Sequence, residues 1–183
     1  GTHATRLSTG LAGGWVVSLA SACMNGDVRL FAGGELGLAT GLASVAEWIG
    51  STWQELEGGP IGDAAAMTAG SVNGATALYV GGQFQLASDP TIKNFARWDG
   101  SSWSGLDAGI VGSVQALIVG EAGAGTLLFV GGSFQDVGAS GARNVAQWDG
   151  SMWQALGGRG SGPDGPVTCM ATYDDGSGRG AAL

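Results

Sequence analysis

A tryptophan pair that recurs at a constant interval constrains the fold of this chain more than any other feature. The pairs are Trp48/Trp53, Trp98/Trp103 and Trp148/Trp153, with a spacing of 50 residues. Glycine doublets recur with them, at Gly33-Gly34, Gly81-Gly82 and Gly131-Gly132, with spacings of 48 and 50 residues. A period near 50 residues indicates stacked supersecondary units, none of which buries its hydrophobic face alone. The sequence therefore predicts a repeat protein.

Each repeat contains four short apolar runs separated by turn residues. In the second repeat they predict strands at about 64–68, 76–84, 94–99 and 102–106. The dipeptides between strands, which tolerate the positive φ angles of tight hairpins, are Asn25-Gly26, Asn73-Gly74, Asp99-Gly100 and Asp175-Gly176. Four strands per repeat at regular spacing predict an all-β fold, a β-propeller of four-stranded blades, with no helix longer than one turn.

The recurring glycines and tryptophans are expected to pack the blades together. We expect the glycine doublet to end the second strand, where a side chain would collide with the adjoining blade. The paired tryptophans are expected to be buried between blades, because an indole ring covers a large apolar area. These are Trp98, Trp103, Trp148 and Trp153 in the two most regular repeats. A platform for stacking sugars is the alternative role.

The motif that follows each doublet resembles a kelch-type β-propeller blade. It reads Ala-x-Trp-Asp-Gly-x-x-Trp at 96–103 and again at 146–153. The blades are most similar to the kelch-like repeats of large bacterial surface proteins and of fungal cortical cell-polarity markers, over residues 7–183. The resemblance implies a ring of about six or seven blades. It specifies no activity, because propellers serve as lectins, enzymes and scaffolds alike.

The repeat pattern divides the chain into whole and partial blades. A leading edge strand at 1–13 is followed by blades at 14–61, 62–111 and 112–164, and by the first strands of an incomplete blade at 165–183. These add up to about three and a half blades. An open arc exposes strand edges and apolar faces. We therefore expect a homo-oligomer, most simply a dimer that closes the ring. A four-bladed ring closed within one chain is the alternative.

Composition excludes several classes of partner. The net charge is −8 and the pI is about 4.3, which argues against binding nucleic acid or an anionic membrane surface through a basic face. No apolar run reaches the roughly 20 residues of a membrane span. Two cysteines do not make a disulfide framework. The composition favours a secreted or cell-surface protein.

Candidate site residues are few. Cys169 aligns with the small residues Ser18, Ala66 and Ala116 of the innermost strands. It is expected to be a buried thiol, and the alternative is a nucleophile facing the channel. The only histidine, His3, lies in a terminal segment that departs from the repeat.

A second group of candidates is acidic. Five aspartates fall in predicted loops that emerge on the same face of a propeller, namely Asp63, Asp89, Asp107, Asp136 and Asp164. Carboxylates gathered at the channel mouth suit Ca²⁺, a hard cation that takes oxygen ligands. Solvated loop residues are the alternative.

Two hypotheses about function follow from these features. The first is a binding or scaffold module, for a small-molecule or glycan ligand that the sequence does not specify. The second is a hydrolase of esterase or phosphoesterase type. It would use the mouth carboxylates with a divalent metal, or Cys169, in the propeller channel.

Overall fold

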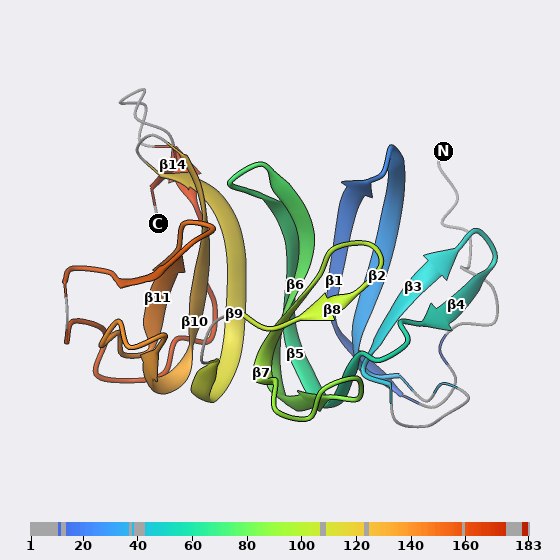
Figure 1. The fold of residues 1–183 in the computed structure, drawn as a ribbon, viewed down its shortest axis with the longest axis horizontal. Coiled ribbons are helices and arrows are strands. Elements are labelled where there is room, and N and C mark those ends of the chain that lie inside the picture. The colour runs from blue at the N-terminus through green and yellow to red at the C-terminus, as the bar shows by residue number, and fades with distance from the viewer. Residues whose placement is uncertain are drawn as a thin grey trace, which may run out of the picture.

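Every element that the structure describes is a strand. The computed structural model describes residues 11, 14–36, 38, 43–106, 109–122, 125–158, 160–174 and 181–182. Within these ranges there is no helix, so the all-β prediction is confirmed there (Figure 1). The described residues accordingly contain no helix that could cross a membrane.

The strands form three antiparallel sheets of four, each in sequence order. The first sheet contains β1 (Trp15–Met24), β2 (Asp27–Glu35), β3 (Val45–Ile49) and β4 (Thr52–Glu55). The second contains β5 (Pro60–Val72), β6 (Ala75–Leu86), β7 (Lys93–Trp98) and β8 (Trp103–Ser104). The third contains β9 (Ile110–Ala122), β10 (Gly125–Val137), β11 (Val145–Trp148) and β12 (Trp153–Ala155). The first two strands of the second sheet are longer than predicted, because their ladder runs from Pro60↔Leu86 to Val72↔Ala75.

The hairpin turns use two different chemistries. Asn25, Gly26, Asn73 and Gly74 all have positive φ angles, between 50° and 89°, as predicted for tight turns between first and second strands. In the third-to-fourth turn, Gly100 has the positive φ of 104°. There the Asp99 carboxylate accepts hydrogen bonds from the backbone nitrogens of Ser101 and Ser102, both at 2.9 Å. Asp175-Gly176 lies outside the described residues.

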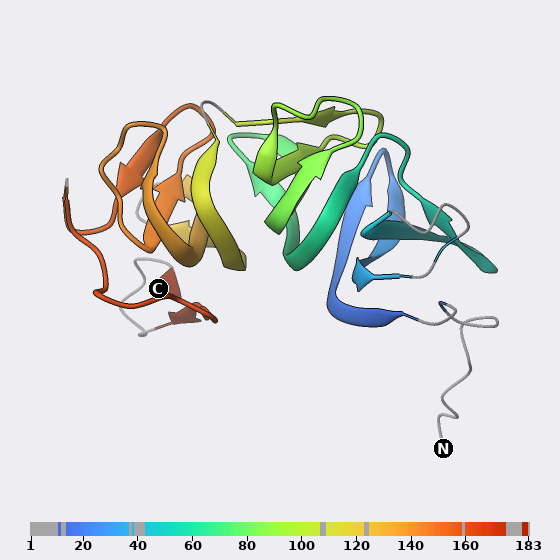
Figure 2. The ribbon, with the colours of Figure 1, turned by 90° about the horizontal axis from the view of Figure 1, so that it is seen from below.

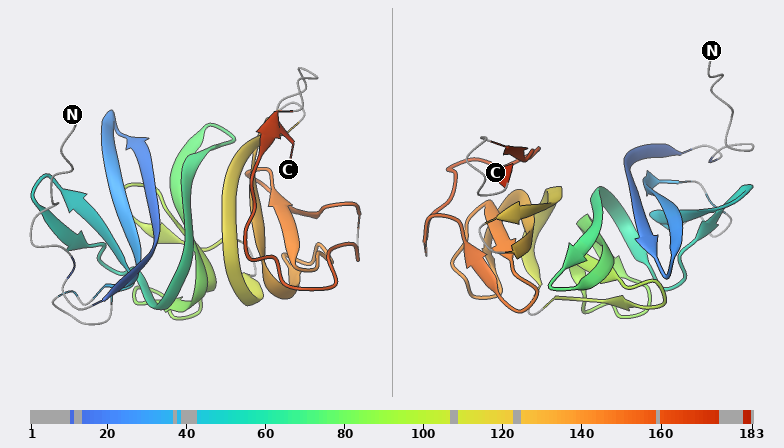
Figure 3. Two further views of the ribbon diagram at one scale, coloured as in Figure 1. Left: turned by 180° about the vertical axis from the view of Figure 1, so that it is seen from behind. Right: turned by 90° about the horizontal axis from the view of Figure 1, so that it is seen from above.

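The sheets stand side by side in an arc. Their first strands, β1, β5 and β9, lie along one side of it, and the third and fourth strands lie along the other (Figures 2 and 3). A short pair, β13 (Tyr173–Asp174) and β14 (Ala181–Ala182), forms a separate sheet beside β9. The described residues do not close a ring.

The glycine doublet lies inside the second strand, so the prediction that it ends the strand is wrong. Gly81 and Gly82 are followed by four more residues of β6. A Cβ on Gly81 would collide with the Val114 side chain of the next sheet, as predicted. A Cβ on Gly82 would collide with the Asp63 carbonyl of its own sheet, where β5 carries a bulge. The same two contacts recur at the other doublets.

Tryptophans of one sheet pack against aromatic rings of the preceding sheet. The ring centroids of Phe31 and Trp98 are 5.7 Å apart, and those of Tyr79 and Trp148 are 6.3 Å apart. Trp98, Trp148 and Trp153 are buried, which confirms their predicted place. Trp103 is more exposed than these three, although its ring nitrogen is buried and its ring packs against the hydrophobic cluster of the first two sheets. The buried rings are not available as a platform for sugars.

Candidate functional site

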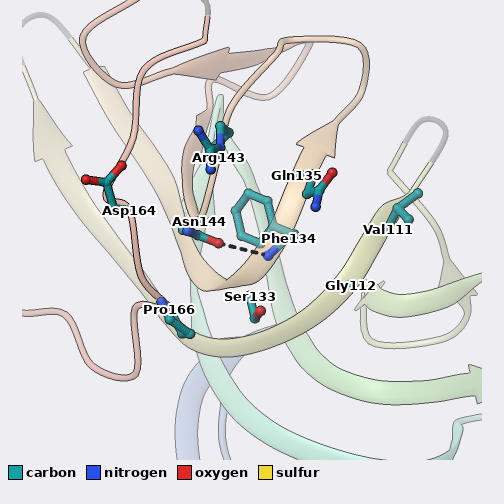
Figure 4. A pocket seen from close by; sticks show the side chains of 9 residues that line it. All are labelled: Val111, Gly112, Ser133, Phe134, Gln135, Arg143, Asn144, Asp164 and Pro166. Atoms are coloured by element: carbon teal, nitrogen blue, oxygen red, sulfur yellow. Dashed lines mark hydrogen bonds between the residues drawn. The ribbon is translucent and has the colours of Figure 1, made fainter.

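A pocket of about 560 Å³ opens at the end of the third sheet (Figure 4). Its volume is within the range of roughly 300–1,000 Å³ that small-molecule sites occupy. The lining combines charged, polar and apolar groups. They come from the third sheet and from the segment that follows it in the chain. The lining residues are Val111, Gly112, Ser133, Phe134, Gln135, Arg143, Asn144, Asp164 and Pro166.

Asn144 fixes the geometry of this pocket. It has φ of 60°, a conformation that asparagine tolerates better than most residues. Its buried side chain accepts a hydrogen bond from the Phe134 nitrogen at 3.1 Å and donates one to the Pro163 carbonyl at 2.9 Å. One side chain therefore ties β10 to the connection that leaves the third sheet. The pocket rests on rigid support, because all these groups are mutually satisfied.

Equivalent residues make the same link in the other sheets. Asn94, with φ of 65°, donates from Nδ2 to the Ile110 carbonyl at 3.1 Å. Ser44, which is buried, donates from Oγ to the Gly62 carbonyl. In each case a polar side chain at or just before the start of the third strand is bonded to the backbone of the segment that leaves the sheet or begins the next one. Sequence analysis missed this link, although the 50-residue interval between Asn94 and Asn144 was a visible signal.

A pocket lies beside each of these side-chain hydrogen bonds, and the residue that precedes the polar side chain differs in charge from one pocket to the next. Asn94 and Lys93 line one of about 430 Å³, just as Asn144 and Arg143 line the first. In the first sheet Ala43 lines a smaller pocket of about 240 Å³. Among the described residues, neither Lys93 nor Arg143 has an ion-pair partner. Two cations of an acidic protein thus stand at repeat-equivalent positions without forming an ion pair to any described residue.

Arg143 and Asp164 give the pocket beside Asn144 both signs of charge. The Arg143 guanidinium comes from the third sheet and the Asp164 carboxylate from the segment that follows it, and Gln135 and Ser133 come from β10 (Figure 4). Arg143 and Asp164 are both exposed. A guanidinium recognises carboxylate or sulfate groups through paired hydrogen bonds. The amide and hydroxyl groups are suited to the hydroxyls of a polar ligand.

The predicted acidic cluster does not assemble among the described residues. Asp63 lies on β5 and Asp164 in the connection to the last segment, both exposed. Asp89 receives hydrogen bonds from the hydroxyl and then the backbone of Thr91, which lower its carboxyl pKa. The Asp136 carboxylate accepts hydrogen bonds from the backbone nitrogens of Val137 and Gly141, at 2.8 and 2.7 Å. Asp107 lies outside the described residues.

No three acidic, cysteine or histidine side chains within the described ranges are close enough together to hold a metal ion. Asp89 and Asp136 each accept local hydrogen bonds at one carboxylate oxygen, Oδ1. The calcium site therefore stays a prediction, with no described group to carry it.

The two cysteines are both exposed. For Cys169 this contradicts the expected burial, because no described strand covers this residue in the single chain. His3 lies outside the described residues, so no base for a Cys169 nucleophile can be placed.

Comparison with known proteins identifies no relative of this chain. No family model matches the sequence. Neither a curated protein nor a solved structure matches it significantly.

Proposed function

We propose that this chain is a binding or scaffold module built as an arc of a kelch-like β-propeller, which closes its ring by self-association. Three four-stranded sheets in sequence order support the propeller, because each covers the face of its neighbour. Pockets at repeat-equivalent joints support the binding role, since propellers commonly place ligands on loops at one face.

The observation that carries the binding proposal is the pocket around Arg143. The Arg143 guanidinium forms no ion pair with a described residue. Ser133, Gln135 and Asp164 line the same pocket with polar groups. This combination suits a small polar molecule with one anionic group and several hydroxyls, such as a uronic acid or an acidic glycan end. The Arg143 guanidinium binds the anionic group, and the other three side chains bind hydroxyls.

Calorimetric titration with glucuronate and galacturonate, against neutral glucose and galactose, tests this proposal. We expect the acidic sugars to bind and Arg143→Gln to weaken them by roughly tenfold or more, since a hydrogen bond to a charged group contributes about 1.5–3 kcal/mol. Arg143→Lys keeps the charge and is expected to retain part of the affinity. Equal binding by wild type and Arg143→Gln would contradict the assignment of this pocket.

The hydrolase hypothesis gains no supporting observation from the described residues. Among these residues Cys169 is exposed with no placed base, and no three acidic, cysteine or histidine side chains are close enough together to hold a metal ion. Secretion or surface display likewise stays a prediction from composition.

A further inference from the structure

The three sheets pack by a contact that repeats along the chain. Val114 and Leu117 of β9 lie over Gly81 of the preceding sheet, with Leu117 Cδ1 at 3.3 Å from the place of a Gly81 Cβ. Val167 and Met170 lie over Gly131 in the same way, with Met170 Sδ also at 3.3 Å. The interval from valine to the larger apolar residue is three residues in both cases. Residues 166–172 therefore occupy the place of a first strand on the third sheet.

A second contact places this segment in the same register. A Cβ on Gly70 would lie 2.8 Å from Val119 Cγ1, and one on Gly120 would lie 2.7 Å from Thr172 Cγ2. Val119 follows Leu117 by two residues, and Thr172 follows Met170 by two. The Val167 nitrogen also donates to the Gly132 carbonyl at 3.0 Å. The segment thus continues the series of first strands, although no described strand pairs with residues 166–172.

Successive first strands also lie against each other, β1 against β5 and β5 against β9. Ser18 Oγ accepts a hydrogen bond from the Met67 nitrogen of the next sheet at 2.9 Å. Ala66 and Ala116 take the place of Ser18 in the second and third sheets, and each is 7% exposed. A small side chain is required there because the following strand lies directly over it.

The beginning of this series is bare. Val16 and Leu19 stand on β1 where Val114 and Leu117 stand on β9, but they are 46% and 62% exposed. Trp15 and Val17 beside them are also exposed. No residue of β1 is charged. Soluble proteins rarely expose a contiguous apolar patch of this kind unless another surface covers it, and exposed strands are usually protected by charge.

The end of the series is bare as well. Cys169 stands where Ser18, Ala66 and Ala116 stand, and it is exposed. Residues 165–173 contain no charged side chain. Among the described residues, Val16 and Leu19 of β1 therefore cover no other segment, and no segment covers residues 166–172 at Cys169.

We propose that β1 of one copy docks on the outward face of residues 166–172 of a second copy, with Leu19 over Cys169 as Met67 lies over Ser18. This inference rests on the proposed self-association and names its surface. It continues the contact that already joins the sheets within the chain. The two bare faces lie at opposite ends of the arc (Figure 2), so two copies make the contact twice. Such a head-to-tail contact forms a ring if the rotation closes and a filament if it does not.

Sedimentation velocity of wild type, Leu19→Asp and the control Val28→Asp tests the inference. Val28 is exposed on β2 and pairs with Cys23 at the hairpin end of β1, four residues along the strand from Leu19. We expect wild type and Val28→Asp to sediment as dimers of twice the 18.1 kDa chain mass. Leu19→Asp is expected to weaken the dimer by about a hundredfold or more, because an unpaired carboxylate would be buried in the contact.

The possible results distinguish a wrong docking surface from a failure of the proposed self-association. A dimeric Leu19→Asp variant beside a dimeric wild type would overturn the surface and leave self-association standing. A monomeric wild type at micromolar concentration would overturn both, whereas sugar binding at Arg143 is measured independently. Leu19 is exposed in the single chain, so both variants are expected to fold, and near-ultraviolet circular dichroism checks this. Leu19→Ser provides a milder substitution, for which a weaker loss in the same direction is expected.

Discussion

Val114 of the third sheet lies over Gly81 of the second so closely that no side chain fits between them. The same relationship joins Met67 to Gly33 and Val167 to Gly131. Each glycine lets the backbone of one sheet approach the side chains of the next. The hydrophobic core therefore consists of the packed interfaces between neighbouring sheets, and an individual sheet has no core of its own.

Gly81→Ala is expected to destabilise the protein by about 1–3 kcal/mol, as overpacking of a filled core does. The control is Gly125→Ala, because nothing lies within 4 Å of a Cβ at Gly125 and its φ is not positive. Chemical denaturation of both variants measures the free energy of unfolding. Equal losses in the two variants would contradict the close approach of Val114.

Trp153→Ala is expected to cost on the order of 3–5 kcal/mol, the usual range for truncating a buried aromatic ring. The Trp153 ring centroid lies 5.7 Å from that of Phe95 in the preceding sheet. Met152→Ala serves as the control, since Met152 is exposed on the adjacent turn and is expected to change stability by about 0.5 kcal/mol or less. Thermal melting compares the two. A small loss for Trp153→Ala would mean that its ring is not part of the packed interface.

Asn144→Ala is expected to cost about 1–3 kcal/mol, because it leaves the Phe134 nitrogen and the Pro163 carbonyl without their partner. Asn144→Gly distinguishes the two contributions of this residue. Glycine relieves the positive φ but restores neither hydrogen bond, so it is expected to remain less stable than wild type. Stability equal to wild type for Asn144→Gly would assign the role of Asn144 to backbone conformation alone.

The fold could be predicted from the sequence where the determinants are local. Asn73-Gly74 sets its hairpin by backbone conformation alone. The motif around Trp148 lies within one sheet and recurs at the same place in the preceding sheet. The position of the glycine doublet inside its strand could not be predicted, because it depends on a bulge in β5 and on contact with another sheet. The pocket around Arg143 was missed for the same reason, since it assembles four separate segments of the chain.

The Asp99 turn is expected to make stability depend on acidity below pH 4. Hydrogen bonds from the backbone of Ser102 and then of Ser101 lower the pKa of Asp99 from 3.8 to about 2. Because the pKa is lower in the folded state, the stabilisation is present above pH 3.8 and is lost as the pH falls towards 2. Asp99→Asn removes the titration. The stability difference between wild type and Asp99→Asn should therefore shrink over this interval, and a constant difference from pH 5 to pH 2 would refute the assignment.

A cross-link between two copies tests the central claim most directly. Ser18 Oγ lies 2.9 Å from the Met67 nitrogen within the chain, and Cys169 and Leu19 stand at the equivalent positions of the proposed contact. Their Cα atoms should therefore come within the roughly 7 Å that a disulfide requires. The variant is Leu19→Cys with Cys23→Ser, oxidised mildly and run on a non-reducing gel, with Val28→Cys in the same background as control. The account predicts a covalent dimer of twice 18.1 kDa for Leu19→Cys alone. No more dimer from Leu19→Cys than from Val28→Cys would contradict it.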